Sequence, residues 1–212
     1  MKTIVIAGIE RGDFCYYVAK TLSHYSRTVI VIDNSLNKEL FDCVQMKTGT
    51  MEDGVYIAKR RDVVYIKDVA YSPEFFDAFE YVIIYEGEVI DTEEIGKADY
   101  VFVMPDYTPL SIEKFKGIDG ENVKYIMRDR AGKFNENSAA ELLDINRDKI
   151  AGCIDYDPMD YAAYLSLLYN GSQKLNKTTV SPECAEAVTY VSALVSGKST
   201  KEVSAVVKAR RD

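Results

Sequence analysis

The sequence predicts an α/β protein whose mostly parallel, seven-stranded sheet is covered by helices on both faces. Seven short apolar runs recur along the 212 residues and alternate with segments of helical period. The first run has no polar alternation, which is typical of a strand buried on both faces. The length suits one domain, residues 1–197, followed by a basic tail, residues 198–212, that we expect to fray.

The first strand, a tight loop and a helix open the predicted sheet. Residues 3–7, Thr-Ile-Val-Ile-Ala, predict a central strand, and residues 8–13 follow as Gly-Ile-Glu-Arg-Gly-Asp. From Phe14 onward, apolar side chains recur at three- and four-residue steps, which predicts a helix. Asp13 is expected to cap this helix. A second apolar run, residues 28–34, completes a βαβ unit.

The other elements follow from the same patterns. Apolar runs predict five further strands, at residues 61–67, 81–85, 100–104, 123–127 and 150–154. Helical periods and Ser-Pro starts predict helices at residues 37–46, 74–79, 92–97, 110–116, 138–143, 160–169 and 183–196. Residues 47–59 carry the turn signals Thr48-Gly49 and Asp53-Gly54 and are expected to be loop. Right-handed crossovers place the loops after the strands along one edge, where such sheets bind ligands.

Composition argues against several classes of protein. A net charge of −8 argues against a specific nucleic-acid binder. The chain has one histidine, His24, which is too few for a His-based metal site and leaves little basis for a catalytic triad. We therefore expect no metal and no catalytic residue. The four cysteines have no C-x-x-C spacing and are typical of free thiols. Because no apolar run approaches the roughly 20 residues that span a bilayer, we expect a cytoplasmic protein.

The loop after the first strand lies where a phosphate cradle would be, but it lacks two parts of one. Three residues separate Gly8 from Gly12 where the motif has four, and Asp13 and Phe14 stand where Lys and Ser/Thr are required. A carboxylate about 4 Å from a phosphate charge is repelled by roughly 4 kcal/mol at an effective dielectric of about 20. Arg11 is a partial substitute for the lysine. The alternative is a tight strand-to-helix turn that binds no phosphate.

The order of segments resembles the ParA/MinD ATPases, P-loop proteins with a deviant Walker A loop. Val29 to Asp33 with Asn34 looks like the family's apolar strand ending in aspartate, and Phe79 to Ile84 like the stretch leading into its Walker B aspartate. Ala98 to Val103 with Pro105 resembles a later family strand. Ile154 to Asp157 followed by Ser181-Pro182 looks like the family's closing segment. The resemblance covers nearly the whole chain and implies a three-layer, P-loop NTPase-like fold.

The departures from the family fall where its chemistry should be. Asp13 stands where the family's Walker A loop has the lysine that precedes its threonine, and Tyr85 stands where the family has its Walker B aspartate. Arg128 stands where the family often has an asparagine, after the sixth strand and near the nucleotide base. Asp33 matches cleanly. Phosphoryl transfer relies on positioning and charge neutralisation by lysine and Mg²⁺, so these losses leave little basis for hydrolysis. The residues of this vestigial nucleotide site are Gly8, Glu10, Arg11, Gly12, Asp13, Asp33 and Arg128.

The resemblance therefore implies a non-hydrolysing scaffold that binds a protein partner as a homodimer in a positioning, pilus-assembly or secretion system. Family members that have lost these residues resemble the CpaE/TadZ proteins of pilus-assembly and secretion loci. One alternative is a nucleotide switch that still binds ATP or ADP with Mg²⁺; otherwise no cofactor is expected. Another is a Rossmann- or flavodoxin-like binder of a small molecule, although G-x-G-x-x-G is absent after the first strand.

Two further features bear on partners. The chain has sixteen tyrosines and no tryptophan, and Tyr156, Tyr161 and Tyr164 gather near the last predicted strand as a candidate partner surface. Core packing explains their spacing equally well. The basic tail, with Val203, Val206 and Val207 on one side, resembles a weak membrane-associating segment, but it lacks the large apolar residues that give such helices their binding strength.

Overall fold

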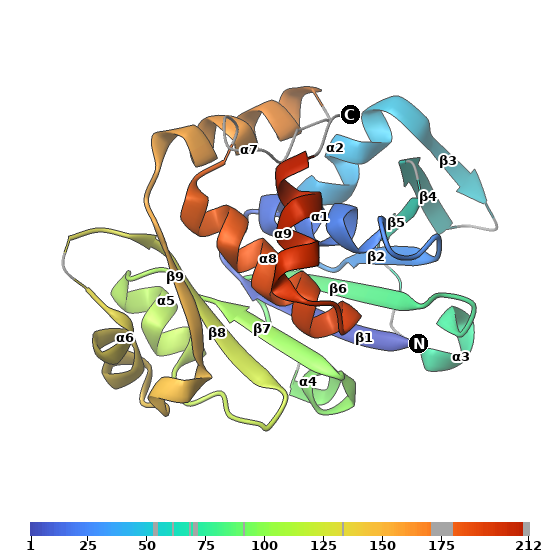
Figure 1. The fold of residues 1–212 in the computed structure, drawn as a ribbon. Coiled ribbons are helices and arrows are strands. Elements are labelled where there is room, and N and C mark those ends of the chain that lie inside the picture. Colours follow the sequence, from blue (N-terminus) through green and yellow to red (C-terminus); the bar gives the residue numbers. More distant parts are fainter. Residues whose placement is uncertain are drawn as a thin grey trace.

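The seven predicted strands form the parallel part of one sheet in a computed structural model of the chain (Figure 1). The structure describes residues 1–52, 55–60, 62–67, 69, 72–90, 92–132, 134–170 and 180–209. The strands are β1 (Lys2–Gly8), β2 (Val29–Asp33), β5 (Val63–Lys67), β6 (Tyr81–Gly87), β7 (Tyr100–Met104), β8 (Val123–Arg130) and β9 (Ile150–Asp155). Their order is β5-β2-β6-β1-β7-β8-β9, so β1 is central, as predicted.

A hairpin extends the sheet beyond β5 and makes it nine-stranded. Its strands are β3 (Gly49–Glu52) and β4 (Val55–Arg60), and β4 pairs antiparallel with both β3 and β5. The sequence predicts loop here because the segment is short and partly polar, and its turn signals do not distinguish a loop from a hairpin. Backbone pairing with the edge of β5 forms these strands. The predicted fold class is confirmed, with two strands more than expected.

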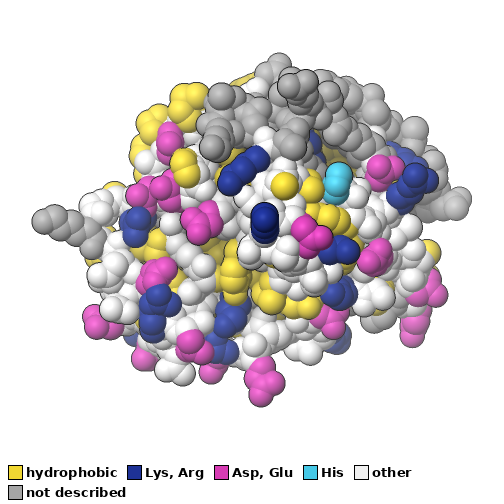
Figure 2. All heavy atoms as spheres, in the orientation of Figure 1, with side chains coloured by type: hydrophobic (Ala, Val, Ile, Leu, Met, Phe, Trp, Pro, Cys, Tyr) yellow, Lys and Arg dark blue, Asp and Glu magenta, His cyan; other side chains and the backbone are white. Residues whose placement is uncertain are grey.

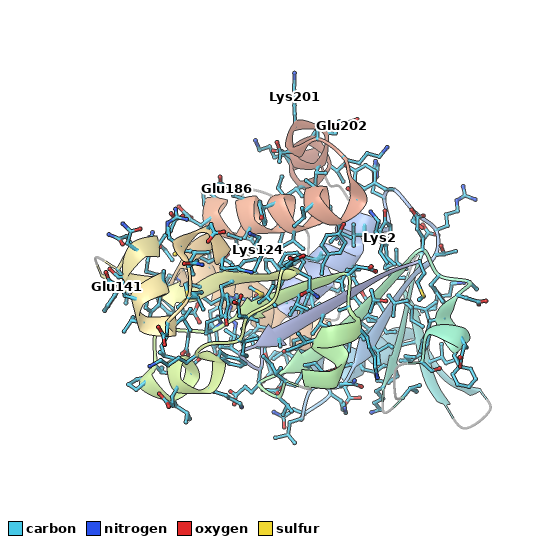
Figure 3. The ribbon with its side chains drawn as sticks, turned by 90° about the horizontal axis from the view of Figure 1, so that it is seen from below. Lys2, Lys124, Glu141, Glu186, Lys201 and Glu202 are labelled. Carbon is cyan, nitrogen blue, oxygen red and sulfur yellow. The ribbon has the colours of Figure 1, made fainter. Side chains whose placement is uncertain are left out.

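Helices cover both faces of the sheet, as predicted. One face is covered by α1 (Asp13–Leu22), α2 (Glu39–Thr48), α7 (Pro158–Asn170), α8 (Pro182–Ser196) and α9 (Thr200–Ala209). The other is covered by α3 (Pro73–Phe76), α4 (Thr92–Lys97), α5 (Pro109–Phe115) and α6 (Glu136–Leu143). A 3₁₀ turn, η1 (Arg147–Lys149), precedes β9. Figures 1 and 3 show these layers from two sides. Each face has its own buried apolar cluster, which gives the sheet its driving force for folding.

The C-terminal segment is a packed helix, so the expectation of a frayed tail is wrong as far as residue 209. Val203 and Val207 of α9 are buried, at 0% and 2% exposure, in the cluster that α1 and α8 share. Lys201 and Glu202 lie on the outer side of α9 (Figure 3). The apolar face that a membrane-associating segment would need is therefore occupied by the protein core. The last three residues of the predicted tail lie outside the described residues.

Local signals place the helix ends of the second half. Ser181 caps α8 by accepting a hydrogen bond from the Cys184 N–H at 3.1 Å, with Pro182 as the first helical residue. Gly197 ends α8 in a left-handed conformation, at φ 69°.

None of the helices in the described ranges has the length and apolar character needed to cross a membrane.

Candidate functional site

The loop between β1 and α1 is folded tightly against the end of β7. A Cβ at Gly8, whose φ is 153°, would lie 2.1 Å from the Met104 carbonyl oxygen, so glycine alone fits. The Ile9 N–H donates to that same carbonyl at 3.2 Å, and the Arg11 N–H donates to the Ile9 carbonyl at 2.7 Å. A phosphate cradle needs such amides to point at the ligand. These two point at protein carbonyls instead.

A buried ion pair holds the first residue of α1. Asp13 and Arg128, the latter near the end of β8, are each 1% exposed. The two guanidinium Nη atoms donate to the two carboxylate oxygens at 2.9 and 3.2 Å, a bidentate arrangement. Burial by itself raises the pKa of Asp13, but the charges of Arg128 and Arg11 outweigh it, and the pKa of this carboxyl is lowered. The pair is therefore ionised.

Asp13 does not cap α1, contrary to the sequence prediction. Gly12 is the N-cap residue and makes no side-chain capping bond, while Asp13 is already helical. The reason is that Arg128 approaches from β8 and takes both carboxylate oxygens. An acid at this position still suits the positive end of the helix dipole. What a phosphate would supply to the helix, a negative charge, is supplied by the chain itself.

Arg11 contacts protein groups and is not turned toward an open site. Its guanidinium donates to both oxygens of Asp129 at 3.0 and 3.1 Å, and to Asp13 at 3.4 Å. It also lies over two rings of α7, 5.7 Å from the centroid of Tyr161 and 5.3 Å from that of Tyr164. The prediction from sequence is that Arg11 partly substitutes for the phosphate-binding lysine. In the structure it binds α7 and the end of β8.

Little space remains at the loop. The cavity bounded by Gly8, Arg11, Phe14, Tyr85 and Arg128 measures about 10 Å³, roughly the volume of one water molecule. Within the described part of the chain, the Nε atoms of both arginines are buried without a hydrogen-bond partner. One water could satisfy them, but a phosphate group is several times larger. The residues present therefore do not fit the phosphates of ATP or ADP with Mg²⁺.

Tyr85 replaces the metal-binding carboxylate of a Walker B strand and closes the loop from the other side. Its hydroxyl donates to the Ile9 carbonyl at 3.3 Å. Burial raises the pKa of Tyr85, and the nearby charge of Glu10 adds to the rise, so the phenol stays neutral. The following residue, Glu86, is buried and accepts from the Asn34 amide at 2.9 Å. Neither side chain is arranged to hold a magnesium ion.

Asp33 and Glu10 tie neighbouring loops together. Asp33 accepts from the N–H and hydroxyl of Ser35, at 3.1 and 2.5 Å, and from the Phe41 N–H at 2.9 Å, which fixes the start of α2. Burial raises the pKa of Asp33 despite these hydrogen bonds, which lower it. Glu10 accepts from the Leu36 N–H at 3.1 Å and the Glu88 N–H at 3.4 Å. Both predicted site residues are thus engaged within the protein.

The three predicted surface tyrosines divide into two groups. Tyr156 and Tyr161 are exposed, at 56% and 45%. Tyr164 is only 6% exposed, so its placement on a partner surface is wrong. The Tyr164 hydroxyl donates to the Glu39 carboxylate at the start of α2. Tyr164 is buried there because α7 packs against α2. Helical spacing alone does not show which side of α7 faces the sheet.

Asp129, which accepts from Arg11, lies in a strand-end segment of the predicted ligand edge but is not among the predicted site residues. Asp129 has a left-handed backbone, at φ 52°, and the β8–β9 register shifts between Met127 and Arg130. This bulge turns consecutive side chains, so that Arg128 points inward while Asp129 meets Arg11. Its place at a strand end, beside Arg128, is the sequence signal for it. Of the predicted nucleotide residues, the structure brings Gly8, Arg11, Asp13 and Arg128 together around one ion network.

A larger hollow lies away from this loop. It measures about 580 Å³ and is lined by residues that precede β8 and β9 or end α6, among them Asp119, Asp144 and Arg147. It is therefore at the opposite edge of the sheet from the Gly8 loop. The described residues contain no group of three side chains suited to hold a metal ion. Nothing in that hollow resembles a nucleotide cradle.

Comparisons with known proteins agree on the fold. No family model matches the chain, and no curated protein matches it. Among solved structures, MinD of Aquifex aeolicus in its MinC:MinD cell-division complex has a TM-score of 0.69 at 14% identity, covering 94% of this chain and 97% of that one. MinD of A. aeolicus alone gives 0.68 at 13% identity, covering 94% and 98%. A ParA family ATPase from Chlorobium tepidum TLS gives 0.60 at 12% identity, covering 97% and 98%.

Proposed function

We propose that this chain is a non-hydrolysing scaffold that acts through contacts with other proteins. It has the fold of MinD and the ParA family ATPases, but its phosphate loop is closed. The observation that carries the proposal is the Asp13–Arg128 pair. It occupies the start of α1 with a fixed negative charge and a fixed positive charge, both buried. A nucleotide would have to break this pair and enter a cavity of about 10 Å³.

The nucleotide-switch alternative needs a rearranged loop. Backbone N–H groups must turn outward, yet those of Ile9 and Arg11 are bonded inward. Arg11 must leave Asp129 and the two tyrosine rings. The small-molecule alternative needs a formed pocket at the ligand edge, where such pockets measure roughly 300–1,000 Å³. The cavity at the Gly8 loop is far smaller.

A protein partner is consistent with the fold neighbours. One MinD neighbour is in a complex with MinC, so a protein of this fold binds another protein. We propose that this chain works likewise in a positioning, pilus-assembly or secretion system, as the CpaE/TadZ resemblance implies. The homodimer that the resemblance implies stays a prediction, which sedimentation equilibrium tests.

Thermal melts and calorimetry with Mg²⁺-ATP and Mg²⁺-ADP test the proposal. A ligand at a hundred times its dissociation constant stabilises a protein by about 2.7 kcal/mol, so a real site is visible as a higher melting temperature. We expect no shift at millimolar nucleotide and no heat of binding.

A shift that Arg11→Ala abolishes would contradict the scaffold and support the nucleotide switch. Arg147→Ala is the matched control, because Arg147 also pairs with a carboxylate, that of Glu136, but lies far from the loop. A shift that survives Arg11→Ala but is lost in Arg147→Ala would place the nucleotide in the opposite hollow, which also contradicts the proposed scaffold.

A further inference from the structure

Large apolar side chains are exposed mainly along the edge of the sheet where the parallel strands end. Twelve such side chains are exposed among the described residues, and seven of them lie on the loops and first helical turns that follow β2, β6, β7, β8 and β9. Single exposed apolar residues need no explanation, but a gathering of them marks an interaction site. The seven, here called the carboxyl-edge surface, are Leu36, Val89, Leu110, Phe134, Tyr156, Met159 and Tyr161.

The loops that carry these residues are joined to one another. Glu10 accepts from the N–H groups of Leu36 and Glu88, which links the loops after β1, β2 and β6. Lys114 of α5 lies 3.6 Å from the Glu88 carboxylate, which brings the helix of Leu110 to the same place.

The outer strands are tied into the same surface. The Tyr107 and Phe134 rings lie 5.0 Å apart, and Arg130 pairs with Asp155 next to Tyr156. At the upper left of Figure 2, where α7 begins, exposed hydrophobic groups stand beside acidic ones. The carboxyl-edge surface is therefore one connected face.

The charge of this face is negative. At the described strand ends, loops and first helical turns of β1, β2, β6, β7, β8 and β9, the surface acids are Glu10, Glu39, Asp42, Glu88, Asp106, Asp129, Glu136, Asp155 and Asp157, and the surface bases are Arg11, Lys38 and Arg130. Lys67, Lys114 and Arg147 reach three of these acids from neighbouring elements, which leaves the acids in excess.

Several of the acids are bonded by uncharged donors. Asp106 accepts from the Thr108 N–H and hydroxyl, at 2.9 and 2.6 Å, and Asp157 accepts from the Met159 N–H at 2.7 Å. Glu10 accepts from backbone N–H groups, and Glu39 accepts from a tyrosine hydroxyl. Such donors hold a carboxylate in place without cancelling its charge. The acids therefore surround the exposed apolar groups with a negative field.

We propose that the carboxyl-edge surface docks a basic segment of another protein, one that alternates Lys or Arg with large apolar side chains. Its cations suit the acidic rim, and its apolar side chains suit the seven exposed ones. A second copy of this chain would place like charges against each other, and an anionic membrane would be repelled. The inference deepens the proposed function, since it names the chemistry of the scaffold's partner.

The closed loop supports this assignment. Glu10 and Arg11 hold the loops of the surface through contacts within the protein, so the surface is ordered without nucleotide. A preorganised surface loses less conformational entropy when a partner binds. The partner therefore meets a formed site at all nucleotide levels.

Fluorescence anisotropy with three labelled peptides of about 18 residues tests the proposal. One peptide carries Leu and Lys at the spacing of an amphipathic helix. The second has Glu in place of Lys, and the third is a scramble of the first. We expect the basic amphipathic peptide to bind at least about tenfold more tightly than the other two, and to bind more weakly as salt rises.

Surface variants decide where the peptide binds. Leu110→Ser combined with Met159→Ser should weaken binding about tenfold or more, because both side chains lie on the surface. Phe75→Ser is the matched control, since Phe75 is 78% exposed and Leu110 is 79% exposed, but α3 lies beside the start of β1, at the other end of the strands (Figure 1). This control should leave the dissociation constant unchanged. Circular dichroism checks that each variant is folded.

Four results would overturn the docking proposal. The first two are equal binding of the basic and acidic peptides, and equal weakening of binding by Phe75→Ser. The third is a dimer, seen in sedimentation, that the Leu110→Ser and Met159→Ser double variant dissociates. The fourth is binding to phosphatidylserine vesicles that the same double variant abolishes. The last two would assign the surface to a second copy or to a membrane. A melting shift with Mg²⁺-ATP would instead contradict the proposed function, and the peptide assay does not depend on it.

Discussion

Asp13→Ala removes one half of a buried ion pair and leaves the other half without a partner. Arg128 is 1% exposed and its two Nη atoms donate to Asp13. Alanine provides no acceptor, and the cavity beside it, of about 10 Å³, admits about one water. Arg11 also loses its 3.4 Å contact and keeps Asp129. The variant therefore holds an uncompensated guanidinium in the interior.

Breaking a buried pair in this way destabilises a protein by about 3–5 kcal/mol. For a domain of this size each kcal/mol lowers the melting temperature by about 2–4 °C, so Asp13→Ala should melt about 6–20 °C lower than the unchanged protein. Replacing both partners, as Asp13→Leu with Arg128→Met, should recover most of that loss, because well-packed apolar side chains substitute for a buried pair.

Urea unfolding followed by circular dichroism measures both variants, and a pH series gives a second readout. The folded-state pKa of Asp13 is lowered, so protonation favours the unfolded chain. The pair's contribution is thus complete above the unfolded-state pKa of about 3.9 and is lost as the pH falls through the folded-state value. An Asp13→Ala loss below about 1 kcal/mol, the size expected of a surface pair, would refute the closed-loop account.

Three other substitutions test further parts of the structure. Gly8→Ala should destabilise the fold by about 3 kcal/mol, because its Cβ would lie 2.1 Å from the Met104 carbonyl; an unchanged urea midpoint would contradict the tight loop. Val203→Asp should release α9, which limited trypsin digestion would show as faster cleavage within residues 198–208; unchanged cleavage would mean that α9 does not depend on this contact. Tyr164→Phe removes the donor to Glu39 and should lower the free energy of unfolding by about 1.5–3 kcal/mol, measured in urea; no change would mean that the hydroxyl contributes nothing.

The parallel sheet could be predicted because its strands have a simple local signature. Runs such as Val29–Asp33 are apolar throughout, and burial on both faces is the physical reason. The hairpin of β3 and β4 has no such signature, since pairing with β5 forms it. The α9 helix was missed because small side chains such as Val203 and Val207 look too weak to hold a segment. They suffice when the core already offers the matching surface.

The candidate site could be predicted only in outline. Sequence spacing identified the loop and the unsuitable charge of Asp13, but it could not show that Arg128 comes from the far end of β8 to neutralise it. Arg128 and Asp13 are 115 residues apart, and their contact depends on sheet order and on a bulge. Likewise, Tyr164 and Tyr161 look alike in sequence, yet one donates to Glu39 and the other remains exposed.

The carboxylate that fills the phosphate loop belongs to the same polypeptide, and this changes how competition works there. A free anion competes through its concentration, which is millimolar for the abundant phosphates of a cell, whereas Asp13 is held permanently at its contact distance. Each factor of ten in the concentration of a free competitor changes its free energy by only about 1.4 kcal/mol. Under the proposed function, swings in nucleotide level produce almost no signal at this loop, and the scaffold works independently of the cell's supply of nucleotide.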